Sequence, residues 1–278
     1  MHVVGKLVET AADLGPFAGH AEGLTRRPLF DRAAGTAQHA VVHNELAGGG
    51  RVDRHMHAFE EGIYVLSGSL AVELSGSREQ LAADDYLWIE FGVPHAVSGA
   101  GAWLEVSAPL PGSSLEDTVF TDGPGATPDV PYRRGHFDPA DLPEPSSAIL
   151  AGAGSNVGGA SVKLLINPDL GASQFILMAL RYVPGGMIKE HDHAFEEGFF
   201  FLDGEIEAVL DGETYTLGPG DYFWSGVESM HALTNRSDRP VRWLETQAPQ
   251  PPSRHQFRYR GDWEQIVGET RFPPRAPS

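Results

Sequence analysis

The chain contains no cysteine, few lysines and no long apolar segment, and each of these absences narrows what it can be. Without cysteine among its 278 residues, it cannot build disulfide bonds, thiolate metal sites or a thiol nucleophile. It has three lysines, a formal net charge of -18 and no run of basic residues. Such a chain repels phosphate groups, so nucleic acid is not an expected partner.

No apolar run approaches the roughly 20 residues of a membrane-spanning helix, so no membrane association is expected. The stretch 1–14 lacks the apolar core of a signal peptide, and the cytoplasm is the expected compartment. Helical periodicity is weak, whereas 33 glycines and 21 prolines suit short strands joined by turns. With 41% hydrophobic residues the chain can still bury a core, so we predict an all-β protein.

An internal repeat dominates the organisation of the sequence. The hexapeptide His-Ala-Phe-Glu-Glu-Gly at 57–62 recurs unchanged at 193–198, and this offset of 136 holds from 55 to 95. Beyond that point the offset becomes 140, because a turn in the second copy, at 235–240, is longer by four residues. Two copies in register predict two β-barrels of the same design in tandem.

Composition along the chain suggests where the two units begin and end. We expect an N-terminal extension at 1–35, a first barrel at 36–110 and a second barrel at 173–250. The intervening segment 111–172 is rich in Gly, Pro, Asp and Ser in its first half. This composition predicts a linker, with an edge strand around 161–165. Residues 251–278 are expected to form a C-terminal tail.

The repeated positions include four residues per copy that suit a metal ion. His55 and His57 lie two apart, so on a strand both side chains face the same side. Glu61 follows past a bend and His95 comes from a later strand. The second copy provides the same set at the same spacings, namely His191, His193, Glu197 and His231. Three imidazoles and one carboxylate suit a divalent transition metal in each barrel, from among Mn, Fe, Ni, Co, Cu and Zn.

These spacings resemble the signature of the cupin superfamily. Each copy has the form Gly-x5-His-x-His-x3-Glu-x6-Gly, at 49–68 and at 185–204, and the second cupin motif is partly present. The resemblance implies a bicupin, in which two small jelly-roll barrels in one chain each hold a metal. The overall organisation is similar to that of ureidoglycine aminohydrolase, whereas the ligand set is more similar to that of quercetinase and oxalate decarboxylase.

Charged neighbours of the ligands offer alternatives and additions to this set. Strict alternation along the strand would put Arg51 on the same face as His55, where it could bind a carboxylate. Glu60 and Glu196 precede the ligand glutamates, and either could be the true ligand. We favour a solvated role for both, because neighbouring residues on a strand face opposite ways.

The second copy offers more candidates for substrate binding and catalysis. Gln247 could hydrogen-bond to a substrate, and Glu228 precedes a ligand histidine by three residues and could carry a proton. The aromatic runs 199–201 and 222–224 predict an apolar pocket there. We therefore expect the second barrel to be the main catalytic site.

The lead interpretation is a metal-dependent enzyme that acts on a small oxygen-bearing organic substrate, with dioxygenase-like chemistry first. A non-redox metallohydrolase or isomerase is one alternative, and a small-molecule binding protein without catalysis is another. A homo-oligomer is compatible with the sequence, which leaves the substrate and the native metal open.

Overall fold

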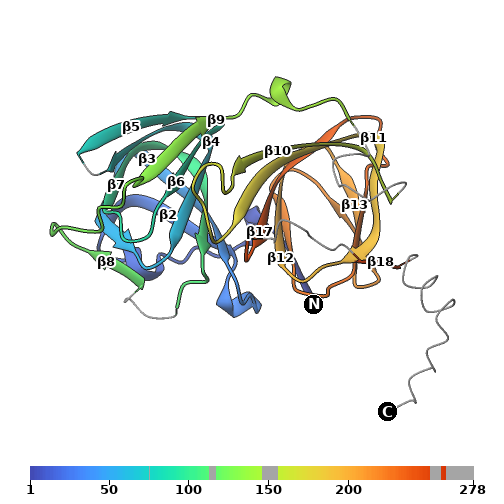
Figure 1. The fold of residues 1–278 in the computed structure, drawn as a ribbon, viewed down its shortest axis with the longest axis horizontal. Coiled ribbons are helices and arrows are strands. Elements are labelled where there is room, and N and C mark those ends of the chain that lie inside the picture. Colours follow the sequence, from blue (N-terminus) through green and yellow to red (C-terminus); the bar gives the residue numbers. More distant parts are fainter. Residues whose placement is uncertain (75, 113–116, 146–155, 251–257, 261–278) are drawn as a thin grey trace, which may run out of the picture.

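The computed structural model describes residues 1–278 except 75, 113–116, 146–155, 251–257 and 261–278. Within this part the chain forms strands curled into two sheets, joined by turns and short 3-10 segments, so the predicted pair of all-β barrels is confirmed (Figure 1). The tail expected at 251–278 lies outside the described residues, apart from 258–260. Among the described helices, none has the length and apolar character needed to cross a membrane.

The first barrel is an antiparallel sheet of eight strands in the order β2-β3-β7-β4-β6-β9, with β5 beside β4 and β8 beside β3. Its strands are β2 (Ala21–Phe30), β3 (Ala40–His57), β4 (Glu60–Leu74), β5 (Ser77–Ala82), β6 (Asp85–Ile89), β7 (His95–Ala108), β8 (Thr118–Phe120) and β9 (Tyr132–His136). The 3-10 segments are η1 (Leu7–Glu9), η2 (Gly15–Phe17), η3 (Arg32–Ala34) and, after β9, η5 (Pro139–Asp141).

The second barrel is a sheet of ten strands in the order β1-β15-β12-β17-β11-β16-β13-β14, with β10 and β18 also paired to β11. Its strands are β1 (His2–Lys6), β10 (Val157–Ile166), β11 (Ile176–Asp192), β12 (Glu196–Asp203), β13 (Ile206–Leu210), β14 (Glu213–Leu217), β15 (Asp221–Ser225), β16 (His231–Thr234), β17 (Val241–Ala248) and β18 (Arg258–Tyr259). The edge strand expected around 161–165 lies within β10.

The two repeats exchange their outermost strands. β1 precedes β2 of the first barrel but pairs with β15 of the second, whereas β9 precedes β10 of the second barrel but pairs with β6 of the first. Both strands place a glycine on a tyrosine ring. A Cβ on Gly5 would lie 2.3 Å from the Tyr222 ring, and one on Gly135 would lie 2.2 Å from the Tyr86 ring. The N-terminus accordingly lies beside the second barrel (Figure 1).

Aromatic rings join the barrels at the glycine of each repeated hexapeptide. One apolar cluster fills each barrel, and a third cluster contains residues of both. In that third cluster Phe175 packs on Gly62 and Phe30 packs on Gly198. An added Cβ would lie 2.8 Å from the first ring and 2.0 Å from the second, so both positions need glycine.

Two buried glutamates bind the backbone of the opposite barrel. The Glu60 carboxylate accepts hydrogen bonds from the N–H groups of Ser173 at 3.0 Å and Gln174 at 3.2 Å. Glu196, at the same position of the repeat, accepts two N–H groups of 37–38 at 2.8 and 3.1 Å. Both carboxylates are buried and satisfied at the interface, so the solvated role expected for them is wrong. They face away from the barrel interiors and are not available as metal ligands.

We expect replacement of Glu60 by alanine to destabilise the metal-free protein by at least about 2 kcal/mol, because the change leaves the buried Trp88 indole N–H and two partly buried interface N–H groups without their acceptor. Equilibrium unfolding in urea measures this loss. Glu73→Ala is the control, since Glu73 is 59% exposed and pairs with Arg78 at the surface, where an ion pair contributes about 1 kcal/mol or less. Equal stability of the two variants would contradict a stabilising role for the interface contact.

Candidate metal centres

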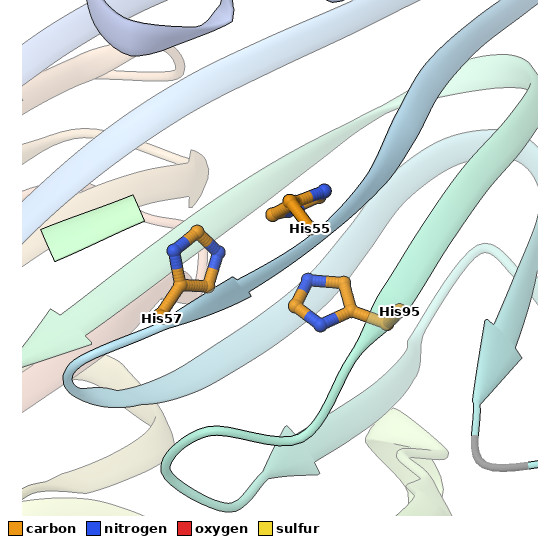
Figure 2. Close-up of side chains that lie close together, drawn as sticks. All are labelled: His55, His57 and His95. Atoms are coloured by element: carbon orange, nitrogen blue, oxygen red, sulfur yellow. The ribbon is translucent and has the colours of Figure 1, made fainter. Parts of the chain in front are cut away.

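Three histidines of the first barrel converge from two neighbouring strands (Figure 2). His55 and His57 come from the end of β3, His95 comes from the start of β7, and all three are buried. One ring nitrogen of each lies within 4.8 Å of the others. Glu61, the second residue of β4, joins them, with its Oε2 at 3.0 Å from His95 Nε2 and 3.5 Å from His57 Nε2.

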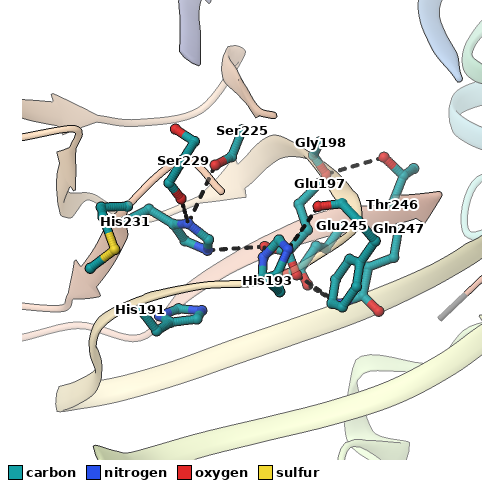
Figure 3. Close-up of polar contacts among 12 residues, drawn as sticks. His191, His193, Glu197, Gly198, Ser225, Ser229, His231, Glu245, Thr246 and Gln247 are labelled. Carbon is teal, nitrogen blue, oxygen red and sulfur yellow. Dashed lines mark hydrogen bonds and ion pairs between the residues drawn. The ribbon is translucent and has the colours of Figure 1, made fainter. Parts of the chain in front are cut away.

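The second barrel repeats this arrangement (Figure 3). His191 lies on β11, His193 directly follows that strand, and His231 begins β16. The Oε2 atom of Glu197 lies 3.0 Å from His193 Nε2 and 3.1 Å from His231 Nε2. Adjacent donors of a metal ion with bonds of about 2.1 Å are separated by about 3 Å, so both sets have the spacing of donors to one ion.

Backbone carbonyls fix the orientation of five of the six ligand imidazoles, and His57 Nδ1 instead lies 3.0 Å from the Thr118 hydroxyl. In the first barrel Nδ1 of His55 donates to the carbonyl of Asp53 at 2.7 Å, and Nδ1 of His95 donates to that of Val93 at 3.0 Å. In the second barrel the three ligand histidines donate in the same way at 2.7 to 2.9 Å, to the carbonyls of Lys189, Phe195 and Ser229. A carbonyl oxygen only accepts, so Nδ1 of each of these five histidines carries the proton and Nε2 presents its lone pair.

The electrostatics of the first barrel favour a bound cation. Burial lowers the pKa of both His55 and His57 well below the usual value, and neighbouring imidazoles add to this effect. Burial acts on His95 in the same sense, but the carboxylate of Glu61 outweighs it and raises the pKa. The facing Nε2 of His57, Nε2 of His95 and Oε2 of Glu61 have no hydrogen-bond partner among the described residues. A cation placed between them would satisfy all three.

The second barrel shows the same opposition of charges. Burial, followed by the neighbouring His231, lowers the pKa of His191 well below its usual value. Burial alone would raise the pKa of Glu197, but the adjacent His193 and His231 hold it well below the usual range. Burial alone would lower the pKa of His231, but Glu197 outweighs it and raises the pKa. A divalent transition metal bound here would take the place of that proton between imidazole and carboxylate.

A cavity of about 320 Å³ reaches the ligands of the second barrel. Its wall includes His191, Glu197 and His231, and most of the remaining wall is aliphatic or aromatic, as at Met178 and Phe199. The cavity therefore combines a polar floor with apolar sides, which is the form of a small-molecule site.

The side chains of Gln247 and Glu245 also line this cavity. Gln247, a residue selected from the sequence, donates its amide to Glu197 Oε1 at 2.8 Å and to Glu245 Oε1 at 3.1 Å. The indole of Trp243 donates to Glu245 Oε2 at 3.0 Å. Burial and the charge of Glu197 raise the pKa of Glu245 well above its usual value. Sequence reasoning missed Glu245, although a charged residue repeated within an apolar strand was a signal for it.

N-terminal residues cover the ligands of the first barrel. The ring centroid of Phe17, in η2, lies 5.2 Å from that of His55 and 6.4 Å from that of His57. The guanidinium of Arg26 lies over the Phe17 ring at 5.1 Å and pairs with Glu105 at 2.7 Å. A neighbouring hollow of about 500 Å³ is lined by Phe17, Arg26 and Glu105, but by none of the four ligands. The two centres therefore differ in access, although their ligands are alike.

Arg51 lies at the surface instead of facing the metal ligands. Its side chain is 53% exposed and pairs with Glu22 at 2.8 Å. The register of β3 against β7 shifts between Val52 and His55, and this bulge breaks the strict alternation on which the expectation rested. Val52 is buried in its place.

Glu228 also lies away from the ligands. It is in the turn between β15 and β16, with a left-handed φ of 63°. Its side chain is 70% exposed, and its nearest ion-pair partner is Arg258 at 3.7 Å. The turn directs this carboxylate towards solvent, so its sequence distance from His231 does not translate into proximity.

Comparison with known proteins identifies the family. The Cupin domain family matches the chain twice, at 42–106 and 178–246. The tetracenomycin polyketide synthase protein TcmJ of Streptomyces glaucescens is 31% identical over 114 residues, which is 38% of this chain and 76% of that protein. The polyketide synthase CurC of Streptomyces cyaneus is 29% identical over 102 residues, which is 35% of this chain and 66% of that protein.

Solved structures share the two-barrel architecture. Oxalate decarboxylase of Bacillus subtilis superposes with a TM-score of 0.66 and 15% identity, covering 98% of this chain and 84% of that one. Oxalate decarboxylase of Lactobacillus farciminis, as a formate complex, gives 0.64 and 16%, covering 99% and 96%. Identity this low shows a common fold alone. With two cupin domains in one polypeptide, the chain is a bicupin and belongs to the cupin superfamily.

Proposed function

We propose that the second barrel is the reaction chamber of a metal-dependent enzyme acting on a small oxygen-bearing organic substrate. The observation that carries this proposal is the cavity of about 320 Å³ whose wall contains His191, Glu197 and His231. In the first barrel the ring of Phe17 packs on the ligand histidines, so the equivalent approach is filled. Access therefore supports the second barrel as the catalytic one.

A divalent transition metal fits the donors of both barrels, with four protein ligands in each. Manganese is the first candidate, because a carboxylate completes the set and because a structural relative is described with Mn(II) centres. A bound metal would supply Lewis acidity and, if redox-active, electrons for dioxygen. The residues that would hold it in the chamber are His191, His193, Glu197 and His231.

The chain's own residues supply exclusion of water, orientation and a proton. Apolar walls keep bulk water from the floor of the cavity. The Gln247 amide binds the carboxyl groups of Glu197 and Glu245 together and so fixes their orientation. Burial and the charge of Glu197 raise the pKa of Glu245, which favours the protonated carboxyl group as a proton donor to a substrate oxygen or enol carbon.

Dioxygenase-like chemistry is the first reaction class, and oxygen consumption tests it. Metal-loaded protein would be screened with enols, phenols and diketones on an oxygen electrode. The second class is non-redox rearrangement or condensation, favoured because both curated relatives are named as polyketide synthase proteins. Polyketides carry series of carbonyl groups that enolise readily. Turnover that continues without oxygen would select this second class.

We expect each barrel to bind one metal ion independently. Changing His55 and His57 to alanine removes two imidazoles of the first set, and changing His191 and His193 does the same in the second. Each double variant should lose one equivalent of metal, measured by mass spectrometry of the purified protein after dialysis against the ion. A double variant with unchanged metal content would show that its barrel is not a metal centre.

We expect activity to depend on the second centre far more than on the first. Glu197→Ala removes the carboxylate in the open cavity and should lower kcat/KM by about 100-fold or more. Glu61→Ala is the matched control at the covered centre and should retain activity within about threefold. Both variants are assayed with the substrate identified by the screen. Loss in Glu61→Ala with full activity in Glu197→Ala would assign the reaction to the first barrel.

A further inference from the structure

Each barrel has a glutamate at the same position of the repeat, but the two glutamates have different hydrogen-bond partners. β7 places Glu105 opposite Val42, and β17 places Glu245 opposite Met178. Val42 and Met178 are themselves equivalent, since the offset of 136 relates β3 to β11. Each barrel therefore carries a buried glutamate at the same depth of its wall.

The first barrel neutralises its glutamate. Glu105 Oε1 accepts a hydrogen bond from the Arg26 guanidinium at 2.7 Å, and Oε2 accepts one from the Asn44 amide at 3.0 Å. Arg26 reaches this carboxylate from β2, where it lies opposite Asn44. A buried carboxylate with a guanidinium and an amide is fully compensated.

The second barrel lacks both of these partners. The strand β10 pairs with β11 in the same register as β2 with β3, and it places Val162 opposite Leu180 at the positions of Arg26 and Asn44. Both apolar residues line the cavity beside Glu245. Two neutral donors, Trp243 and Gln247, are the hydrogen-bond partners of the Glu245 carboxyl within the described part of the chain.

We propose that this substitution of Val162 for arginine makes the second barrel selective for neutral oxygen-bearing substrates, such as diketones and hydroxyketones, and against dicarboxylates. The inference rests on the proposed function, since it names the substrate class of that same chamber. Val162, which stands where the first barrel has its arginine, is the specificity-determining residue. Oxalate, as a dianion, falls in the class of substrates that we expect this cavity to exclude.

The charge of the cavity wall explains the selection. Among the described residues that line the cavity there is no lysine or arginine, whereas it is lined by the carboxylate of Glu197 and the carboxyl group of Glu245. A dianion entering such an apolar space would lose its hydration without gaining a cationic side chain, which is costly. A carbonyl or hydroxyl oxygen loses far less hydration and can hydrogen-bond to the carboxyl of Glu245 or the amide of Gln247.

Acetylacetone and malonate form a matched pair of probes, because each has two oxygen-bearing groups on a three-carbon unit and only malonate is a dianion. The protein carries His55→Ala and His57→Ala, so that cobalt(II) occupies the second barrel alone. Visible absorption of the cobalt reports ligand binding directly. We expect acetylacetone to bind at least tenfold more tightly than malonate.

Two double variants in this background isolate the charge. Val162→Arg with Glu245→Gln introduces the arginine of the first barrel without a carboxylate partner, and should shift the preference at least tenfold towards malonate. Val162→Met with Glu245→Gln is the control, with a long uncharged side chain, and should leave the acetylacetone preference in place. One equivalent of bound cobalt in each variant confirms that the barrel is intact.

Three results would count against the inference or its basis. If the parent protein binds malonate as tightly as acetylacetone, the selectivity is absent, and this measurement needs no further variant. If both double variants show the same preference, the arginine position does not determine it. If neither probe perturbs the cobalt spectrum, the cavity does not admit ligands to the metal, and the proposed reaction chamber fails as well.

Discussion

In each barrel, the metal centre and the interface with the other barrel depend on two consecutive glutamates whose side chains face opposite ways. A strand turns successive side chains to opposite faces, so Glu60 and Glu196 point out to the other barrel while Glu61 and Glu197 point in to the histidines. The outward carboxylate binds backbone N–H groups across the interface. In each barrel the residue that contacts the other barrel directly precedes the ligand glutamate in the sequence. The geometry of each metal centre is therefore coupled to the pairing of the two barrels.

The sequence was most informative where its repeat was most regular. Two barrels follow from a register that persists over whole strands, and the structure brings the equally spaced histidines together. Arg51 was expected inside because alternation was extrapolated through a bulge, which the residue types do not reveal. Arg26 was not found because its contact with Glu105 requires β2 to lie beside β3, a pairing of distant segments. Local patterns cannot specify such non-local contacts.

The two barrels place the same set of metal ligands in different surroundings. Metal-binding geometry is preserved in both, and backbone carbonyls hold five of the six ligand imidazoles in the same tautomer. The surroundings have diverged, with Phe17 and a charged pair over one centre and an apolar cavity over the other. The repeat provides two equivalent metal centres, and the first can be covered while the second stays open to its cavity. In this chain the two centres therefore differ in their walls and not in their ligands.

The exchange of outer strands has a consequence for synthesis on the ribosome. β1 is synthesised before β2 to β14, yet its partner is β15, so β1 lacks this partner while all the intervening strands are made. The first barrel is likewise complete only after β9 has followed it. The first barrel, β2 to β9, is one continuous segment, whereas the second barrel cannot be excised as one because β1 is separated in sequence from β10 to β18. A nascent chain that stalls midway would thus present an open strand, able to pair with a second chain in the same state.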